Sequence, residues 1–350
     1  MKRWVTNRAA GFSRLTVHVS LLTSRASLLA TMRRWVSMGA AGGVVIVSTL
    51  VLTGAPSRAA SFDAWGQCVG DANRDGQVTV DELVRGVNNA LSGCDFTPVE
   101  IRFSAHVGEQ EFACGTTYEG IGTTRARLTP SDFRFYVSDI RLVTEDGTPV
   151  PVLLDQDGIW QLEDIALLDF ENKQPPCVNG TVLTNRSIRG RIAPGTYTGL
   201  RFVLGIPFRR NHGDASVAPP PLSLTGMFWS WQDGYKFLRV DSTVEDLRLH
   251  LGSTGCFYAR PGVVGGCARP NRAEVWLQPF DWQHDVVVAD LAALLAESDL
   301  TANQPNTPPG CMSDPGDADC VPIMRNLGID FASGLPSVAT QKFFRVVASH

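Results

Sequence analysis

Two tryptophans and a histidine within one short stretch are the residues best suited to chemistry. The stretch is Met227–Cys256, MFWSWQDGYKFLRVDSTVEDLRLHLGSTGC. Successive side chains of a strand alternate between faces, so Trp229 and Trp231 are expected on one side. His250 alternates with leucines that need the core, so we expect it to point away from the core. This pattern predicts a site, and the competing interpretation is a tryptophan-rich β core beside a surface histidine.

The other histidines that could join such a site are few. His212 follows an apolar strand that ends at Ile206, and His106 faces away from the apolar side of its own strand. A metal site needs convergent donors, and imidazole suits copper and zinc. Each of these histidines, taken singly, is also explained by a surface or capping role. His284 and His350 have no support beyond their identity.

A second metal-binding pattern lies nearer the N-terminus. The twelve residues from Asp71 to Glu82 fit the calcium loop of EF-hands, with Gly76 at the sharp turn and Val78 as the packing residue. A single amphipathic helix is expected over Asp81–Leu91, with Leu83, Val84, Val87 and Leu91 facing inward. The unit resembles half of a dockerin, and the alternative is an ordinary acidic turn. The predicted calcium ligands are Asp71, Asn73, Asp75, Gln77, Thr79 and Glu82.

Motifs for common enzyme chemistry are missing. The sequence contains no HExxH, no phosphate-binding GxxxxGK[ST] loop, no GxGxxG and no GxSxG. We therefore expect a protein that is not an enzyme and has no catalytic residues. A net charge of −4 without a basic stripe argues against nucleic acid as a partner.

The cysteines indicate an oxidising compartment. There are 8 cysteines, and none forms a CxxC pair. An even number in an exported chain favours disulfides over free thiols. Proximity in sequence suggests Cys68–Cys94, Cys256–Cys267 and Cys311–Cys320, which leaves Cys114–Cys177.

An export signal is predicted downstream of the first methionine. Met32-Arg33-Arg34 begins a positive segment, Met38–Thr53 is apolar, and Ser57-Arg58-Ala59 resembles a cleavage site. Residues 1–31 then form an upstream extension. The apolar run is short for a membrane span, so we expect a periplasmic or secreted protein without stable membrane insertion; an uncleaved anchor is the alternative.

The chain divides into three predicted segments that contain these features. Residues 1–60 hold the extension and signal, 61–97 the calcium unit, and 98–350 a mainly β domain. Short alternating runs separated by turn residues predict an antiparallel β-sandwich or barrel with long disulfide-pinned loops. A short helix is expected at Asp290–Glu297. The predicted strands are Glu100–Val107, Phe133–Leu142, Val150–Leu154, Ile159–Leu162, Ala166–Phe170, Ser187–Ile192, Tyr197–Leu204, Glu274–Pro279 and Val286–Val288.

Ten sequence blocks in the span from about residue 100 to 345 carry a family resemblance. They are Phe112–Gly115, Asp132–Asp139, Leu167–Asn172, Tyr197–Phe202, Gly205–Phe208, Asn211–His212, Phe228–Gln232, Gly234–Arg239, His250–Cys256 and Gly310–Ser313. With these blocks in this order, the chain resembles the methanobactin-associated MbnP family, the four-cysteine partner in metallo-mystery pairs. The calcium unit lies outside the resemblance.

The resemblance implies a periplasmic copper-binding protein. In the family, an MbnH-like diheme cytochrome related to bacterial cytochrome c peroxidases oxidises a tryptophan to kynurenine, which joins two histidines as a copper ligand. Carried over, the ligands are His212 and His250, the modified residue is Trp229 or Trp231 with a preference for Trp231, and His106 is a further candidate. The chemistry agrees, because an indole N–H is a donor only, whereas kynurenine has an aromatic amine. Asp169, Glu171 and Arg239 are expected beside the ligands or in buried ion pairs.

Two other functions remain open from the sequence. One is a structural or carbohydrate-binding β-module that uses Trp229 and Trp231 as a stacking platform, which requires both rings to be exposed. The other is an oxidoreductase in which copper turns over, and no feature of the sequence favours it.

Overall fold

The computed structural model describes residues 95–244 and 246–348, the backbone strands at 31–38 and 44–51, and residues 79–80, 83–84 and 87. The chain divides into two units, Met1–Gly66 and Gln67–His350. In the first, β1 (Thr31–Met38) pairs antiparallel with β2 (Val44–Val51). The predicted cleavage site lies outside the described residues. No helix within the described ranges is long and apolar enough to cross a membrane.

The predicted calcium unit falls almost entirely outside the described residues. Of its six predicted ligands, Thr79 is described, whereas Asp71, Asn73, Asp75, Gln77 and Glu82 are not. The predicted helix is present at the described positions Val80, Leu83, Val84 and Val87. The expectation that Leu83, Val84 and Val87 face inward was wrong, because they are 54%, 54% and 57% exposed. Cys68 and Cys94 also lie outside the described residues.

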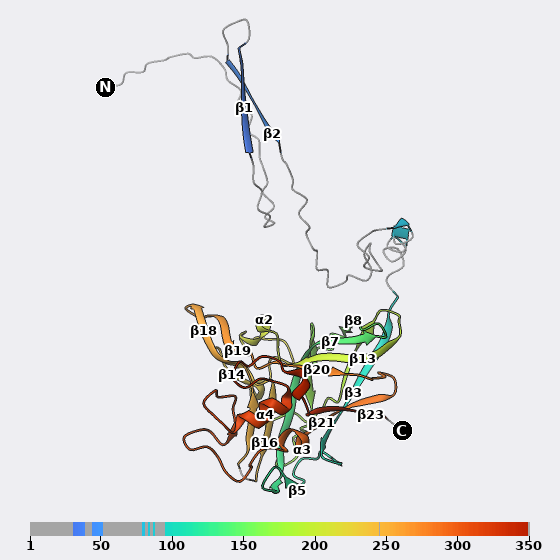
Figure 1. Cartoon of the computed structure of the whole chain (residues 1–350), viewed down its shortest axis with the longest axis vertical. Coiled ribbons are helices and arrows are strands. Elements are labelled where there is room, and N and C mark those ends of the chain that lie inside the picture. Colours follow the sequence, from blue (N-terminus) through green and yellow to red (C-terminus); the bar gives the residue numbers. More distant parts are fainter. Residues whose placement is uncertain are drawn as a thin grey trace, which may run out of the picture. The chain divides into compact units, whose positions relative to one another are not determined.

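The second unit is mainly β, as predicted (Figure 1). A six-stranded sheet contains β3 (Thr97–Val107), β4 (Gln110–Glu111), β9 (Leu153–Leu154), β12 (Ser187–Ile192), β21 (Asp285–Asp290) and β23 (Phe344–Ala348). A nine-stranded sheet contains β7 (Pro130–Thr144), β8 (Pro149–Pro151), β10 (Gln161–Leu162), β11 (Ile165–Asp169), β13 (Tyr197–Leu204), β16 (Leu238–Ser242), β17 (Arg248–Leu251), β20 (Ala273–Leu277) and β22 (Gly310–Cys311).

Smaller elements complete the unit. Three two-stranded ribbons are β5–β6 (Tyr118–Ile121 and Ala126–Leu128), β14–β15 (Phe228–Ser230 and Gly234–Tyr235) and β18–β19 (Thr254–Arg260 and Val263–Arg269). The helical segments are α2 (Phe208–Asn211), η1 (Thr225–Met227), α3 (Leu291–Leu295), α4 (Cys320–Leu327) and η2 (Val338–Thr340).

The hydrophobic core lies between the two large sheets, which makes the unit a β-sandwich. Phe103 on β3 contacts Phe135 on β7 and Phe202 on β13 edge-to-face, with ring centroids 6.2 and 5.9 Å apart. The alternation predicted for β3 is confirmed, since its odd-numbered residues from Val99 to Val107 are buried. Aromatic pairs of this geometry add to the free energy gained by burying their area.

The long strand β7 organises the nine-stranded sheet. Its first half pairs with β11 and β16, and its second half pairs with β13 and β8. β16 pairs in turn with β17, so the strand that carries His250 lies two positions from β7. The three described disulfides, Cys114–Cys177, Cys256–Cys267 and Cys311–Cys320, confirm the predicted pairings.

Candidate metal site

His250 is buried within the sheet and paired with a carboxylate. It lies on β17 and is 7% exposed. Its Nε2 is 2.6 Å from Oδ1 of Asp241 on β16. His250 alternates with the leucines as expected, but the competing interpretation of a surface histidine was wrong, because the face opposite the leucines is also covered. A carboxylate accepts, so Nε2–H donates to Asp241, and Nδ1 is the nitrogen left for another partner.

Burial and this ion pair set the charges of the two residues. Burial lowers the pKa of His250, and the hydrogen bond to Asp241 only partly offsets that effect. Burial would raise the pKa of Asp241, but His250 and the Arg239 guanidinium outweigh it and bring the pKa to about 2. At neutral pH the pair therefore consists of a neutral imidazole and a carboxylate. A neutral imidazole is the form that binds metals.

Trp229 lies against His250. Their ring centroids are 6.3 Å apart, and the tryptophan is half-buried on β14. The ring also packs on Gly252, where an added Cβ would lie 2.4 Å from Cζ3 of Trp229. Gly252 is therefore the position that lets the indole approach the strand next to His250.

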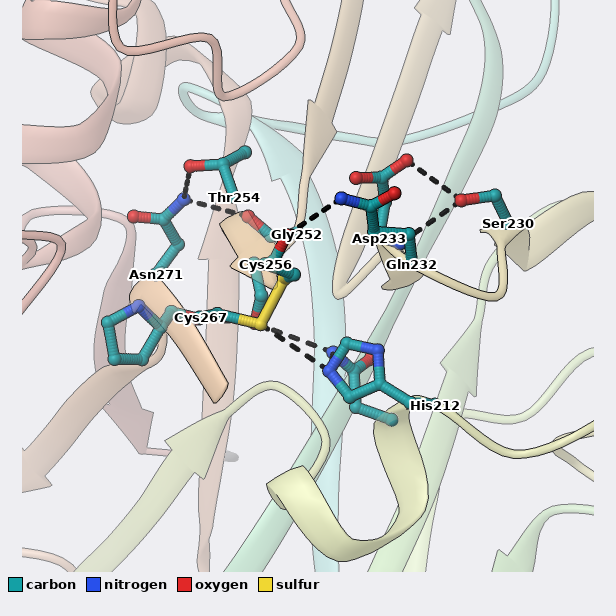
Figure 2. Close-up of a disulfide and its surroundings, with 12 residues drawn as sticks. His212, Ser230, Gln232, Asp233, Gly252, Thr254, Cys256, Cys267 and Asn271 are labelled. Carbon is teal, nitrogen blue, oxygen red and sulfur yellow. Dashed lines mark hydrogen bonds between the residues drawn. A yellow bond between two sulfur atoms is a disulfide. The ribbon is translucent and has the colours of Figure 1, made fainter. Parts of the chain in front are cut away.

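Trp231 occupies a different environment from Trp229. The strand β14 ends at Ser230, so Trp231 belongs to the turn and is 51% exposed. The hydroxyl of Ser230 donates a hydrogen bond to the carboxylate of Asp233 across this turn, with Oγ 2.8 Å from Oδ2 (Figure 2). The prediction that the two tryptophans share one face of a strand was wrong, because the strand is too short to include both.

His212 contacts the backbone of the turn that contains Trp231. It follows α2 directly, and its Nδ1 lies 3.3 Å from the carbonyl oxygen of Trp231. A carbonyl only accepts, so Nδ1 carries the proton and Nε2 is the nitrogen with the lone pair. The amide N–H of Asn211 donates to Nε2, with Nδ2 at 3.3 Å. Sγ of Cys267 lies 3.4 Å from the same nitrogen (Figure 2). Burial lowers the pKa of His212, which favours the neutral ring.

Asn211 ties this histidine to the tryptophan stretch. It is fully buried, and its Oδ1 accepts the backbone N–H of Tyr235 at 2.9 Å. Its Nδ2 lies 3.4 Å from Oγ of Ser253. The stretch Met227–Cys256 is thus hydrogen-bonded to α2. His212 and His250 therefore both border the hairpin formed by β14 and β15, which we call the tryptophan hairpin.

His106 lies apart from these residues. It is on β3 in the six-stranded sheet, opposite Glu111 of β4 and Asp290 of β21. Its Nδ1 is buried and has no hydrogen-bond partner. Within the described residues, no contact joins His106 to His212 or His250, so the structure does not bring this candidate to the others.

A chain of buried charges extends from His250 into the sheet. Arg134 donates from Nε to Oδ1 of Asp132 at 2.8 Å, and Arg239 lies 3.2 Å from the same carboxylate. Arg239 also contacts Asp241 at 2.6 Å. Arg239 was expected either beside the ligands or in a buried ion pair, and here it is in both positions. Asp132, Arg134 and Asp241 had not been singled out from the sequence, although the β16–β17 register, once known, places Asp241 beside His250.

The other two predicted carboxylates, Asp169 and Glu171, are fully buried. Among the described residues neither forms an ion pair or contacts His212 or His250, so the expectation for these two residues is not met. Oδ1 of Asp169 accepts the backbone N–H of Glu171 at 2.9 Å, and the other oxygen, Oδ2, has no hydrogen-bond partner. Burial raises the pKa of Asp169 to about 8, even though the charge of Arg134 opposes this. Burial also raises the pKa of Glu171.

Comparisons with known proteins identify a family and a solved structure that this chain resembles. The family model described as MbnP matches residues 96–313. The solved structure of MbnP from Methylosinus trichosporium is 29% identical, with a TM-score of 0.63, and the match covers 73% of this chain and 100% of that one. No curated protein matches. Residues 96–313 contain the strands of both large sheets except β23, together with the tryptophan hairpin and both histidines. The chain belongs to the MbnP family.

Proposed function

We propose that this protein binds copper outside the cytoplasm and carries or buffers it there. The observation that carries the proposal is the pair of neutral imidazoles at the tryptophan hairpin. Nε2 of His212 and Nδ1 of His250 are the ring nitrogens without protons, because the other nitrogen of each ring donates to Trp231 or Asp241. A hydrogen bond from the far nitrogen to a carboxylate or carbonyl is the usual way a metal-binding imidazole is oriented.

A third ligand would come from Trp229 after oxidation. Conversion to kynurenine opens the indole, releases one carbon as formate and leaves an aromatic amine that can coordinate a metal. Two peroxide molecules supply the oxidant, and a diheme partner of the peroxidase class is the expected catalyst, so this chain is a substrate and not an enzyme. Trp229 replaces Trp231 as our preferred residue, since its ring lies against His250 whereas Trp231 is 51% exposed.

Copper suits this donor set. Two imidazoles and an aromatic amine are nitrogen donors, and copper binds such sites most tightly among the common divalent ions. The oxidising compartment implied by the three described disulfides fits an exported copper protein. A stacking platform for carbohydrate fits less well, because it requires both rings to be exposed and Trp229 is half-buried against Gly252.

Two measurements test the proposal together. The first is peptide mass analysis over Met227–Lys236 of protein exported by its native host. We expect Trp229 to have lost one carbon and gained one oxygen. The second is a copper titration of His212→Ala, His250→Ala and the double variant, with His284→Ala as the matched surface control. Each single variant should lose at least tenfold in affinity, and retained binding in the double variant would refute the site.

A further inference from the structure

A disulfide lies directly against His212. Cys256 on β18 is bonded to Cys267 on β19, and the two residues face each other in the ribbon register. Figure 2 shows the imidazole of His212 directed at the sulfur of Cys267. The ligand atoms of His212, Cys256 and Cys267 all lie within 4.8 Å of one another. Two sulfurs and an imidazole nitrogen are therefore already grouped at one point.

The ribbon would keep the two sulfurs together if their bond were broken. Backbone pairing between β18 and β19 continues on both sides of the cysteines, from Thr254 opposite Arg269 to Arg260 opposite Val263. The Cα atoms of the two cysteines are 3.8 Å apart. The ladder alone places opposed Cα atoms about 4.5–5.5 Å apart, so it would keep the two thiols as neighbours after reduction. Such preorganisation lowers the entropy that a ligand must overcome on binding.

The surroundings of this disulfide also allow it to be reached. Cys267 is half-buried, and the ribbon around it is largely exposed, with Phe257 at 57% and Tyr258 at 48%. In the Cys311–Cys320 disulfide, by contrast, both cysteines are buried, at 2% and 0% exposed. Thiol–disulfide exchange requires access of a thiolate to one sulfur, so Cys256–Cys267 is the more accessible of these two bonds.

We propose that reduction of Cys256–Cys267 creates a cuprous site made of both thiolates and Nε2 of His212. Thiolates are soft ligands that select Cu(I). The nitrogen without a proton already faces Cys267 at 3.4 Å, and to join the thiolates it exchanges the hydrogen bond from Asn211 for the metal. This site deepens the proposed function, since it rests on copper as the cargo and shares His212 with the imidazole pair.

The electrons for reduction of Cys256–Cys267 would come from a dithiol reductant of the thioredoxin class. The reductant attacks one sulfur, a mixed disulfide forms, and its second thiol resolves it. Two electrons and two protons pass to Cys256 and Cys267, and the reductant becomes a disulfide. When Cu(I) binds, the two thiols release their protons. The protein would then hold copper in two ways, through His212 and His250 when oxidised and through sulfur when reduced.

The test uses the whole exported protein, treated with a phosphine reductant, freed of it without oxygen, and titrated with Cu(I) against a chromogenic chelator. The informative variant is His250→Ala. In its oxidised form it should bind copper at least tenfold more weakly than the parent protein, and after reduction it should regain one tightly bound Cu(I). Sulfur neighbours in the copper X-ray absorption spectrum are expected only after reduction.

Matched variants separate this inference from the proposed function. Cys256→Ser with Cys267→Ser should abolish the gain on reduction, whereas Cys311→Ser with Cys320→Ser should keep it. Alkylation of the reduced wild-type protein is a measurement that does not depend on the folding of a variant. Bound Cu(I) should lower the rate of alkylation of Cys256 and Cys267 at least tenfold. Absence of protection, or a gain that survives the Cys256/Cys267 variant, overturns the cuprous site. Retained copper binding by the oxidised His212/His250 double variant contradicts only the imidazole site.

Discussion

The carboxylate of Asp241 decides which nitrogen of His250 can reach a ligand. Its Oδ1 accepts from Nε2 at 2.6 Å, and the contact is shielded from water. Asp241→Asn would let an amide N–H face that nitrogen, which favours the proton on Nδ1 and removes the lone pair. Loss of such a partner typically lowers metal affinity 10- to 100-fold, and we expect about that change in a competition titration.

A matched control exists at the surface. His284 is paired with Asp281 by an Nδ1–Oδ2 contact of 2.8 Å, but both side chains are exposed. Asp281→Asn therefore removes a His–Asp hydrogen bond of similar length away from the site. Copper affinity should be unchanged in this variant. An equal loss in both variants would mean that Asp241 acts through general stability.

The buried carboxyl of Asp169 predicts an unusual dependence of stability on pH. Its pKa is about 8 in the folded protein, while an exposed aspartate in the unfolded chain has a pKa of about 4. Between these values the folded state holds a proton that the unfolded state has released. Unfolding then releases a proton, so this group makes the folded state less stable as pH rises from about 4 to about 8.

Asp169→Asn tests that dependence. The amide keeps the acceptor for the N–H of Glu171 and carries no charge at any pH. The melting temperature of the variant relative to the parent should therefore rise from pH 5 to pH 8. Asp155→Asn, at an exposed position, serves as the control. A constant difference between Asp169→Asn and the parent across this range would contradict the raised pKa.

At the scale of elements, the end of β17 packs closely against the tryptophan hairpin at Gly252. Gly252→Ala would bring a Cβ to 2.4 Å from the ring of Trp229 and to 2.8 Å from the carbonyl of Tyr235. We expect an overpacking cost of about 1–3 kcal/mol in urea unfolding, together with weaker copper binding. Gly213→Ala is the control, because its Cβ would meet nothing closer than 3.8 Å.

Strands with clear alternation were predictable from the sequence, and the short elements of the site were not. β12 and β13 have their predicted bounds, since apolar residues recur in each and turn residues flank them. No strand was predicted for the ribbon β18–β19, because its glycines weaken the strand pattern. No helix was predicted for α4, whose eight residues include a proline.

The two histidines were identified from the resemblance, but their surroundings depended on tertiary pairing. His250 alternates with leucines as expected, yet the other face of β17 is covered by the tryptophan hairpin. No local pattern shows that a second layer will cover a strand. The group formed by His212 and the Cys256–Cys267 disulfide also escaped prediction, because 55 residues separate His212 from Cys267.

At the scale of the molecule, the described disulfides should contribute unequally to stability. Cys114–Cys177 joins residues 63 apart, and Cys311–Cys320 joins residues 9 apart. A longer closed loop restricts the unfolded chain more, with expected contributions of about 4 and about 2.6 kcal/mol. Paired Cys→Ala variants compared by urea unfolding would measure the difference. A larger loss for Cys311–Cys320 would show that strain or native contacts outweigh loop entropy.

The chain of buried charges also constrains how this family can diverge. Asp132 is shared by Arg134 and Arg239, and Asp241 is shared by Arg239 and His250. Replacing Asp132 leaves the buried guanidinium of Arg134 without its ion-pair partner, a loss of about 3–5 kcal/mol. Evolution can therefore replace these residues only in compensating sets. In an alignment of relatives, positions 132 and 239 should co-vary, whereas the exposed β18–β19 ribbon should drift freely outside its two cysteines.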